Sequence, residues 1–152
     1  KATPGLDLLL FDLPAVAEQG RQRFAREGLA DRAMAMGGDF TTDSLPLGAD
    51  IISLVRVLHD HDDDVVQALL RRVRAALPKG GRVLIAEPMA GTAGAEPMGG
   101  AYFGFYLLAM GRGRPRRPDE LAGMLTEAGF RAPKLLPTDT PLLTRVMQAE
   151  AA

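Results

Sequence analysis

The sequence contains no cysteine and no tryptophan, and it has only two histidines. Without cysteine the chain has neither disulfide bonds nor thiolate chemistry, which fits the reducing cytoplasm where we expect the protein to work. A formal net charge of −1 over 152 residues gives no excess of positive charge for binding nucleic acid. The longest apolar stretch of the C-terminal half, Ala101–Met110, is too short for a bilayer, which requires about 20 residues.

Over the whole chain 47% of the residues are hydrophobic and 24% are charged, as in a globular protein. The chain is expected to form one domain. Apolar runs predict strands at Leu8–Leu13, Arg32–Met36, Ala49–Leu58, Arg82–Glu87, Lys134–Pro137 and Leu142–Gln148. Helices are expected at Ala15–Leu29, Asp62–Leu77, Ala101–Met110 and Pro118–Ala128, and a loop at Pro88–Gly100. This alternation predicts an α/β fold with a mostly parallel sheet, and the last two strands are candidates for an antiparallel edge.

Ionisable residues stand at the ends of four of these strands. They are Asp12, Asp39, the pair His59 and Asp60, and Glu87. In an open α/β sheet the carboxyl ends of parallel strands lie along one edge, and ligands bind there. One aspartate after a strand is most often a turn or cap residue. Four successive strands with such endings favour a binding or catalytic site.

Three interpretations compete for the cluster that contains both histidines. His59, His61 and Asp63 imitate the H-x-H-x-D ligand run of metallo-β-lactamase-like hydrolases, although Asp64 stands where a further histidine is required and the chain has no third one. Alternatively, Asp62–Asp64 only cap the following helix. In the third interpretation His59, beside the carboxylate of Asp60, is a general base that removes a proton from a hydroxyl.

Four motifs in fixed order give the chain a resemblance to a known family. The motifs are Phe11–Pro14 (FDLP), Gly38–Phe40 (GDF), Arg56–Asp60 (RVLHD) and Leu84–Pro88 (LIAEP). Together they resemble the S-adenosylmethionine-dependent O-methyltransferases of the caffeate and hydroxyneurosporene type, from about Leu6 to the C-terminus. The resemblance implies a Rossmann-like class I methyltransferase sheet.

The family's cofactor-binding roles carry over to six positions of this sequence. Asp12, followed by Leu13, matches the acid that holds the ribose of S-adenosylmethionine. Gly38 precedes Asp39 and Phe40, which match the pair that contacts the adenine. Arg56 lies close to a basic position that contacts the cofactor.

The catalytic roles carry over to three residues, and the mechanism that they imply needs no metal. His59 matches the general base, Asp60 is its neighbour in the motif, and Glu87 matches a carboxylate that orients the base. Methyl transfer from a sulfonium is an in-line displacement, so alignment and removal of the hydroxyl proton supply most of the acceleration.

The stretches Ser53–Asp63 and Ala101–Pro115 are similar to the bacterial carotenoid branch of the family. That branch methylates the tertiary hydroxyl of hydroxyneurosporene or demethylspheroidene, so a small hydrophobic hydroxylated substrate and a homodimer are implied. A tertiary alcohol is a weak acid, so proton loss is expected to accompany methyl transfer.

The sequence also departs from the family pattern. The first strand and the glycine-rich cofactor loop would precede Leu6, so the chain is expected to be the C-terminal part of a catalytic domain that is inactive by itself. Pro115 stands where plant relatives have a second orienting glutamate. A non-catalytic, self-associating α/β fragment is the alternative. Four arginines are expected in a solvated turn, with peripheral contact to membrane lipids as a less favoured role: Arg112, Arg114, Arg116 and Arg117.

Overall fold

The computed structural model describes residues 3–94 and 111–152, and it divides into two units, Lys1–Pro46 and Leu47–Ala152. The helix expected at Ala101–Met110, and the second half of the loop expected at Pro88–Gly100, lie outside the described residues. None of the helices within the described ranges has the length and hydrophobicity of a membrane span.

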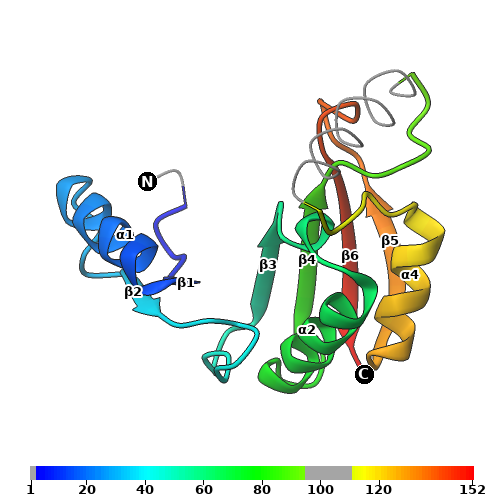
Figure 1. Cartoon of the computed structure of the whole chain (residues 1–152). Coiled ribbons are helices and arrows are strands. Elements are labelled where there is room, and N and C mark those ends of the chain that lie inside the picture. The colour runs from blue at the N-terminus through cyan, green and yellow to red at the C-terminus, as the bar shows by residue number, and fades with distance from the viewer. Residues whose placement is uncertain (1–2, 95–110) are drawn as a thin grey trace. The chain divides into compact units, whose positions relative to one another are not determined.

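The first unit is one βαβ motif (Figure 1). Strand β1 (Leu8–Asp12) leads into helix α1 (Pro14–Arg26), and strand β2 (Ala33–Gly37) returns parallel to β1. Pro14 occupies the first turn of α1, where its fixed φ and missing N–H cost nothing. The register pairs the strand ends Asp12 and Gly37, so the polar residues that follow both strands lie at one edge.

Gly20 lies in the interior of α1, where glycine ordinarily weakens a helix. A Cβ at this position would lie 2.5 Å from Cδ2 of Leu10. The missing side chain therefore lets α1 approach β1 closely, and this packing explains why the helix continues through a residue with poor helix propensity.

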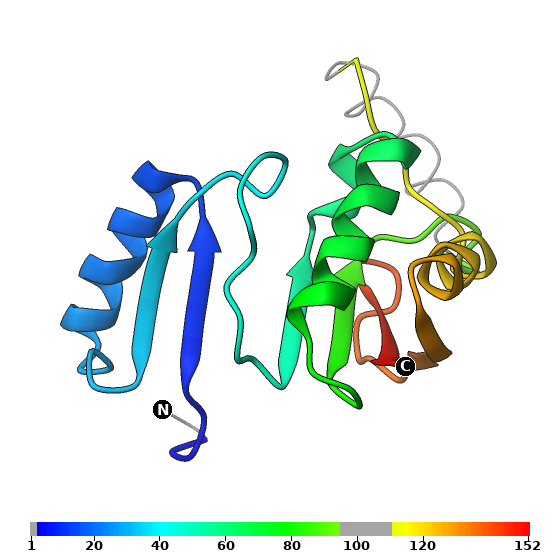
Figure 2. The same ribbon diagram turned by 90° about the horizontal axis from the view of Figure 1, so that it is seen from below.

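The second unit is a four-stranded mixed sheet in the order β3-β4-β6-β5, with helices α2 and α4 (Figures 1 and 2). Its elements are β3 (Ile51–Val55), the short 3-10 helix η1 (Leu58–Asp60), α2 (Asp63–Ala76), β4 (Arg82–Glu87), α4 (Pro118–Glu127), β5 (Phe130–Leu136) and β6 (Arg145–Ala151). Strands β3 and β4 are parallel, whereas β6 is antiparallel to both β4 and β5. This confirms the α/β fold with an antiparallel C-terminal edge.

The core of the second unit lies between the helices and one face of this sheet. The face of α2 contributes side chains that are completely buried, Val66, Leu70 and Val73, and α4 contributes Leu121 and Leu125. Alternate residues of the central strands meet them, namely Val83, Ile85, Met147 and Ala149. Glu87 continues the alternation of β4, so its side chain is directed toward the same buried layer.

Several strand boundaries differ from the sequence prediction. The strand expected at Ala49–Leu58 ends already at Val55, because Arg56 has φ of 55° and the chain then turns into η1. The two C-terminal strands form the expected antiparallel pair, but β5 already begins at Phe130, and β6 runs from Arg145 to Ala151. The start of β5 and the end of β6 were not predicted, because the charged residues Arg131 and Glu150 interrupt the apolar pattern in these strands.

We expect Leu70→Ala to destabilise the second unit by about 2–5 kcal/mol, because it removes a buried side chain and leaves a cavity between α2 and the sheet. Urea unfolding followed by circular dichroism measures this change. Arg71→Ala, on the exposed side of the same turn, should change the free energy of unfolding by no more than about 0.5 kcal/mol. Equal effects of the two substitutions would contradict the described packing of α2.

Candidate active site

The structure brings His59, Asp60 and Glu87 together where β3 and β4 end. Glu87, the last residue of β4, is 1% exposed, and its Oε2 accepts hydrogen bonds from the backbone N–H groups of Leu58 (3.1 Å) and His59 (3.3 Å). The same oxygen lies 3.4 Å from His59 Nδ1. One buried carboxylate therefore holds both the backbone and the ring of His59.

The other ring nitrogen of His59 faces Asp60. Nε2 lies 3.3 Å from Asp60 Oδ1, a buried oxygen that accepts no well-aligned hydrogen bond from the described residues. The imidazole itself is 2% exposed, so its ring is enclosed with a carboxylate at each nitrogen. Such an arrangement fixes the orientation of the ring, which a general base requires.

A glycine from a distant part of the chain packs against this turn. Gly113 has φ of 82°, and a Cβ there would lie 2.4 Å from the His59 carbonyl oxygen. Its N–H donates a hydrogen bond of 2.9 Å to Asp62 Oδ1. Asp62 holds the N-cap position of α2, yet its side chain makes no cap hydrogen bond with that helix. For Asp62, the expectation that this carboxylate only caps the helix is therefore wrong.

Arg116 is buried, in contrast to the solvated turn expected for the arginine-rich segment. The residue is 1% exposed, and its guanidinium donates to the carbonyl oxygens of Leu58 (2.7 Å) and His61 (2.8 Å). Nε and Nη2 both donate to Asp63 Oδ1, at 2.9 and 2.7 Å. The burial of Arg116 could not be predicted from the sequence, because its partners lie more than fifty positions away. The only signal in the sequence is the acidic run Asp62–Asp64, which needs a positively charged partner.

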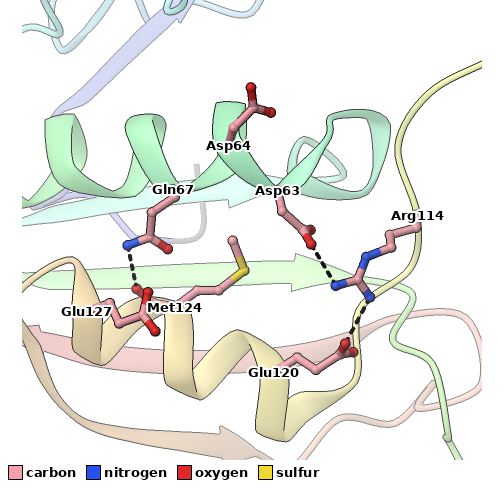
Figure 3. A pocket seen from close by; sticks show the side chains of 7 residues that line it. All are labelled: Asp63, Asp64, Gln67, Arg114, Glu120, Met124 and Glu127. Carbon is pink, nitrogen blue, oxygen red and sulfur yellow. Dashed lines mark hydrogen bonds and ion pairs between the residues drawn. The ribbon is translucent and has the colours of Figure 1, made fainter.

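Arg114 connects the start of α2 to α4 at the surface. It forms ion pairs of 3.0 Å with Asp63 and with Glu120, and Figure 3 shows its side chain between the two helices. Its hydrogen bond to Asp63 holds the pKa of that carboxyl below its usual value. Arg114 is therefore paired rather than only solvated, which corrects the expectation for a second arginine of the segment.

An open hollow of about 380 Å³ lies beside Arg114 between the two helices (Figure 3). Its lining residues are Asp63, Asp64, Gln67, Arg114, Glu120, Met124 and Glu127. Asp63, a ligand in the metal interpretation, belongs to this lining, but none of the residues predicted to bind S-adenosylmethionine or to act in methyl transfer does. We therefore place the candidate active site at His59, where buried ionisable groups converge.

In the first unit, the predicted cofactor residues meet at the ends of β1 and β2. Asp12 Oδ1 accepts the N–H of Leu13 at 2.7 Å, and the Asp12 carbonyl accepts the N–H of Gly38 at 2.9 Å. Gly38 is also closely packed, because a Cβ there would lie 2.5 Å from the ring of Phe11. The two strand ends thus carry Asp12, Leu13 and Gly38 side by side.

The turn that follows Gly38 is ordered by carboxylates. Asp39 Oδ1 accepts hydrogen bonds from the N–H and the hydroxyl of Thr41, and the Asp39 N–H donates to Asp43 Oδ2 at 2.8 Å. Phe40 follows within this turn and is half-buried. These bonds fix the backbone that carries Asp39 and Phe40.

Arg56 lies in the second unit, directly after β3. Its backbone N–H donates to the Ala86 carbonyl at 2.9 Å, which continues the pairing of β3 with β4. The side chain is exposed. A role of Arg56 in cofactor binding stays a prediction.

Residues 3–94 and 111–152 contain no group of three acidic or histidine side chains with the geometry of a metal site. Of the three ligands that the metal interpretation requires, Asp63 is engaged by two arginines. Burial, followed by the positive charge of Arg112, lowers the pKa of His61 below 6.5. The two arginines therefore occupy the carboxylate of Asp63 that the metal interpretation requires.

The sequence matches one protein family over most of its length. A model of the O-methyltransferase domain matches residues 1–131. The chain belongs to this family.

Two relatives from bacteria are named demethylspheroidene O-methyltransferase. The relative from Cereibacter sphaeroides is 49% identical over 149 residues, which cover 98% of this chain and 39% of the relative. The relative from Rhodobacter capsulatus is 45% identical over 150 residues, which cover 99% of this chain and 37% of the relative. The chain therefore spans about two fifths of the length of these proteins.

Solved structures agree with the fold. The crystal structure of LaPhzM superposes with a TM-score of 0.88 at 31% identity, covering 99% of this chain and 44% of that one. Human N-acetylserotonin methyltransferase, solved in complex with S-adenosylmethionine, superposes with a TM-score of 0.83 at 28% identity, covering 98% of this chain and 41% of that one. The fold is that of a class I O-methyltransferase.

We expect Arg112→Gln to raise the pKa of His61, because it removes a positive charge that opposes protonation. The groups that act on His61 are Arg112 and Arg116, which lower its pKa, and Asp60 and Asp62, which raise it. An NMR pH titration of the two histidines measures the change, with Arg117→Gln as the control.

The lowered pKa of His61 also determines how the stability of the folded chain changes with pH. With a depressed pKa in the folded state, the unfolded chain binds the His61 proton first, so stability is lost as pH falls through 6.5. In Arg112→Gln this loss should be smaller. A His61 pKa that is unchanged by the substitution would contradict the described charge arrangement.

Proposed function

We propose that this chain is the C-terminal portion of the catalytic domain of an S-adenosylmethionine-dependent O-methyltransferase. The observation that carries the proposal is the buried His59 imidazole with a carboxylate at each nitrogen, at the carboxyl ends of parallel strands. The names of the two bacterial relatives support a carotenoid hydroxyl, such as that of demethylspheroidene, as the acceptor.

The residues of the first unit suit the proposed cofactor. Asp12 uses Oδ1 for the neighbouring Leu13 N–H, and a carboxylate has further acceptor sites for the two hydroxyls of a ribose. Asp39 and Phe40 offer a carboxylate and an aromatic ring on a fixed turn, which suit an exocyclic amine and a purine face. Gly38 completes this set, and we include Arg56 as a further cofactor-binding residue. When bound, S-adenosylmethionine supplies an electrophilic methyl group.

His59 performs the proton transfer in this proposal. Glu87 holds Nδ1 and the backbone, and we assign the proton of the acceptor hydroxyl to Nε2, which lies 3.3 Å from Asp60 Oδ1. The two neighbouring carboxylates stabilise the positive charge that the ring acquires. Since a tertiary alcohol is a weak acid, its proton would pass to His59 as the oxygen–methyl bond forms and the sulfur–methyl bond breaks, with S-adenosylhomocysteine as the leaving group, rather than in a separate earlier step.

A homodimer, a cytoplasmic location and a peripheral contact with membrane lipids stay predictions. The fragment's lack of activity by itself stays a prediction as well, and activity is therefore to be measured on the complete protein.

Asp12→Asn should weaken binding of S-adenosylhomocysteine at least about tenfold, because a hydrogen bond to a charged acceptor contributes about 1.5–3 kcal/mol. Isothermal titration calorimetry on the complete protein measures the affinity. Asp7→Asn is the matched control, because Asp7 precedes β1 on the exposed surface. If the wild-type protein binds no S-adenosylhomocysteine, the proposed cofactor is wrong and a non-catalytic role is favoured.

His59→Gln should lower kcat by a factor of about 10²–10⁴, the usual contribution of a general base, while cofactor affinity is retained. Methyl transfer from labelled S-adenosylmethionine to demethylspheroidene is the measurement. His61→Gln removes the other imidazole of the chain and should retain activity. Losses of similar size in both variants would instead favour a metal site.

A further inference from the structure

We infer that Arg116 is a positioning residue that fixes the peptide group before His59 and so sets the position of the base. The structural part of the inference stands on the hydrogen bonds of the turn alone. Its consequence for catalysis rests on the proposed function, because His59 has a proton to transfer only if that proposal holds.

The peptide bond between Leu58 and His59 is held at both of its polar ends. Its N–H, which belongs to His59, donates to Glu87 Oε2 at 3.3 Å. Its carbonyl, which belongs to Leu58, accepts from Arg116 Nη1 at 2.7 Å. Glu87 comes from β4 and Arg116 from the segment before α4, so two separate parts of the second unit fix the plane of one peptide group.

Arg116 also holds the far side of the turn. Nη2 donates to the His61 carbonyl at 2.8 Å, so the guanidinium spans the η1 turn from Leu58 to His61. The planar fork of arginine can reach two carbonyls and a carboxylate at once, whereas the ammonium of lysine is a single point charge. Arg116 thereby stabilises the backbone on both sides of His59.

The buried charge is compensated on one side by Asp63. The side chain of Arg116 is buried, whereas that of Asp63 is 54% exposed and also pairs with Arg114. Burial of a guanidinium is costly unless its N–H groups are paired, and here Nε, Nη1 and Nη2 all have acceptors. The arginine thus bonds the turn and α2 at the same time.

Gly113 gives a second, independent contact between the same segment and the turn. No side chain fits at this position, because a Cβ would lie within 3.0 Å of both the His59 carbonyl oxygen and the Asp60 backbone. The backbone of the Gly113 segment is therefore pressed against the residue that carries the base. The hydrogen bonds of Arg116 and the close packing of Gly113 thus hold the turn from residues 113–116, while Glu87 holds it from β4.

The first measurement is amide hydrogen exchange on the full chain, for the wild type and for Arg116→Gln. We expect exchange of the Leu58 and His59 amides to rise at least about tenfold, because the peptide plane loses one of its supports. The Ile85 amide in the centre of β4 should change much less. Arg117→Gln, one residue further along and exposed, is the matched control and should change neither.

The second measurement is steady-state kinetics of the complete protein. Arg116→Gln should lower kcat at least about tenfold with an unchanged KM for S-adenosylmethionine, because misplacement of a base affects the chemical step. Arg116→Lys should recover part of the loss. A folded Arg116→Gln protein in which the 58 and 59 amides exchange as in the wild type, or in which kcat is unchanged, would overturn the inference.

A further variant covers the case in which Arg116→Gln does not fold. Asp63→Asn loosens the guanidinium without emptying a buried space, so it should raise exchange at Leu58 and His59 to a smaller extent. If it leaves exchange and kcat unchanged, the inference fails. If the wild-type protein transfers no methyl group, the proposed function fails, and exchange alone decides the role of Arg116.

Discussion

The buried carboxylate of Glu87 is the constraint on which the second unit's functional edge depends. A negative charge at the end of an apolar strand must be compensated by donors that reach it. The Leu58 N–H, the His59 N–H and His59 Nδ1 surround the same oxygen. To bring them there, β3 ends at Val55 and the chain turns into η1, so the position of the imidazole is a consequence of satisfying Glu87.

This constraint explains which parts of the structure could be predicted from the sequence. The strand Arg82–Glu87 and the helix at α2 follow from local apolar periodicity, which one segment carries by itself. The end of β3 did not follow, because Val57 and Leu58 continue the apolar pattern, whereas the N–H groups of Leu58 and His59 donate to Glu87 on another strand. The residues at the carboxyl ends of the strands were predictable, but their hydrogen bonds were not. Arg116 and Gly113 were missed as parts of the site because their partners lie about fifty residues away.

The two units differ in how their functional residues are held. In the first unit the only fully or nearly buried apolar side chains are Ala17 and Ala33, among the residues that the structure describes, and Met34 is 65% exposed. A two-stranded sheet with one helix gains little from such a core. A ligand that binds this unit when it is folded would stabilise it by mass action.

In the second unit, charged groups hold the backbone and the ring of His59, the proposed base. A buried arginine and a buried glutamate contribute less to stability than hydrophobic residues of similar size would, because both must be desolvated. They fix an orientation instead. Glu87 and Arg116 form hydrogen bonds with the N–H and the carbonyl of one peptide group, and these bonds restrict rotation of the peptide plane. A general base benefits from this restriction, since proton transfer requires alignment within hydrogen-bonding distance. The same residues that hold the backbone of this turn therefore suit it to the proposed catalysis, and substitutions there should affect the chemical step more than cofactor affinity.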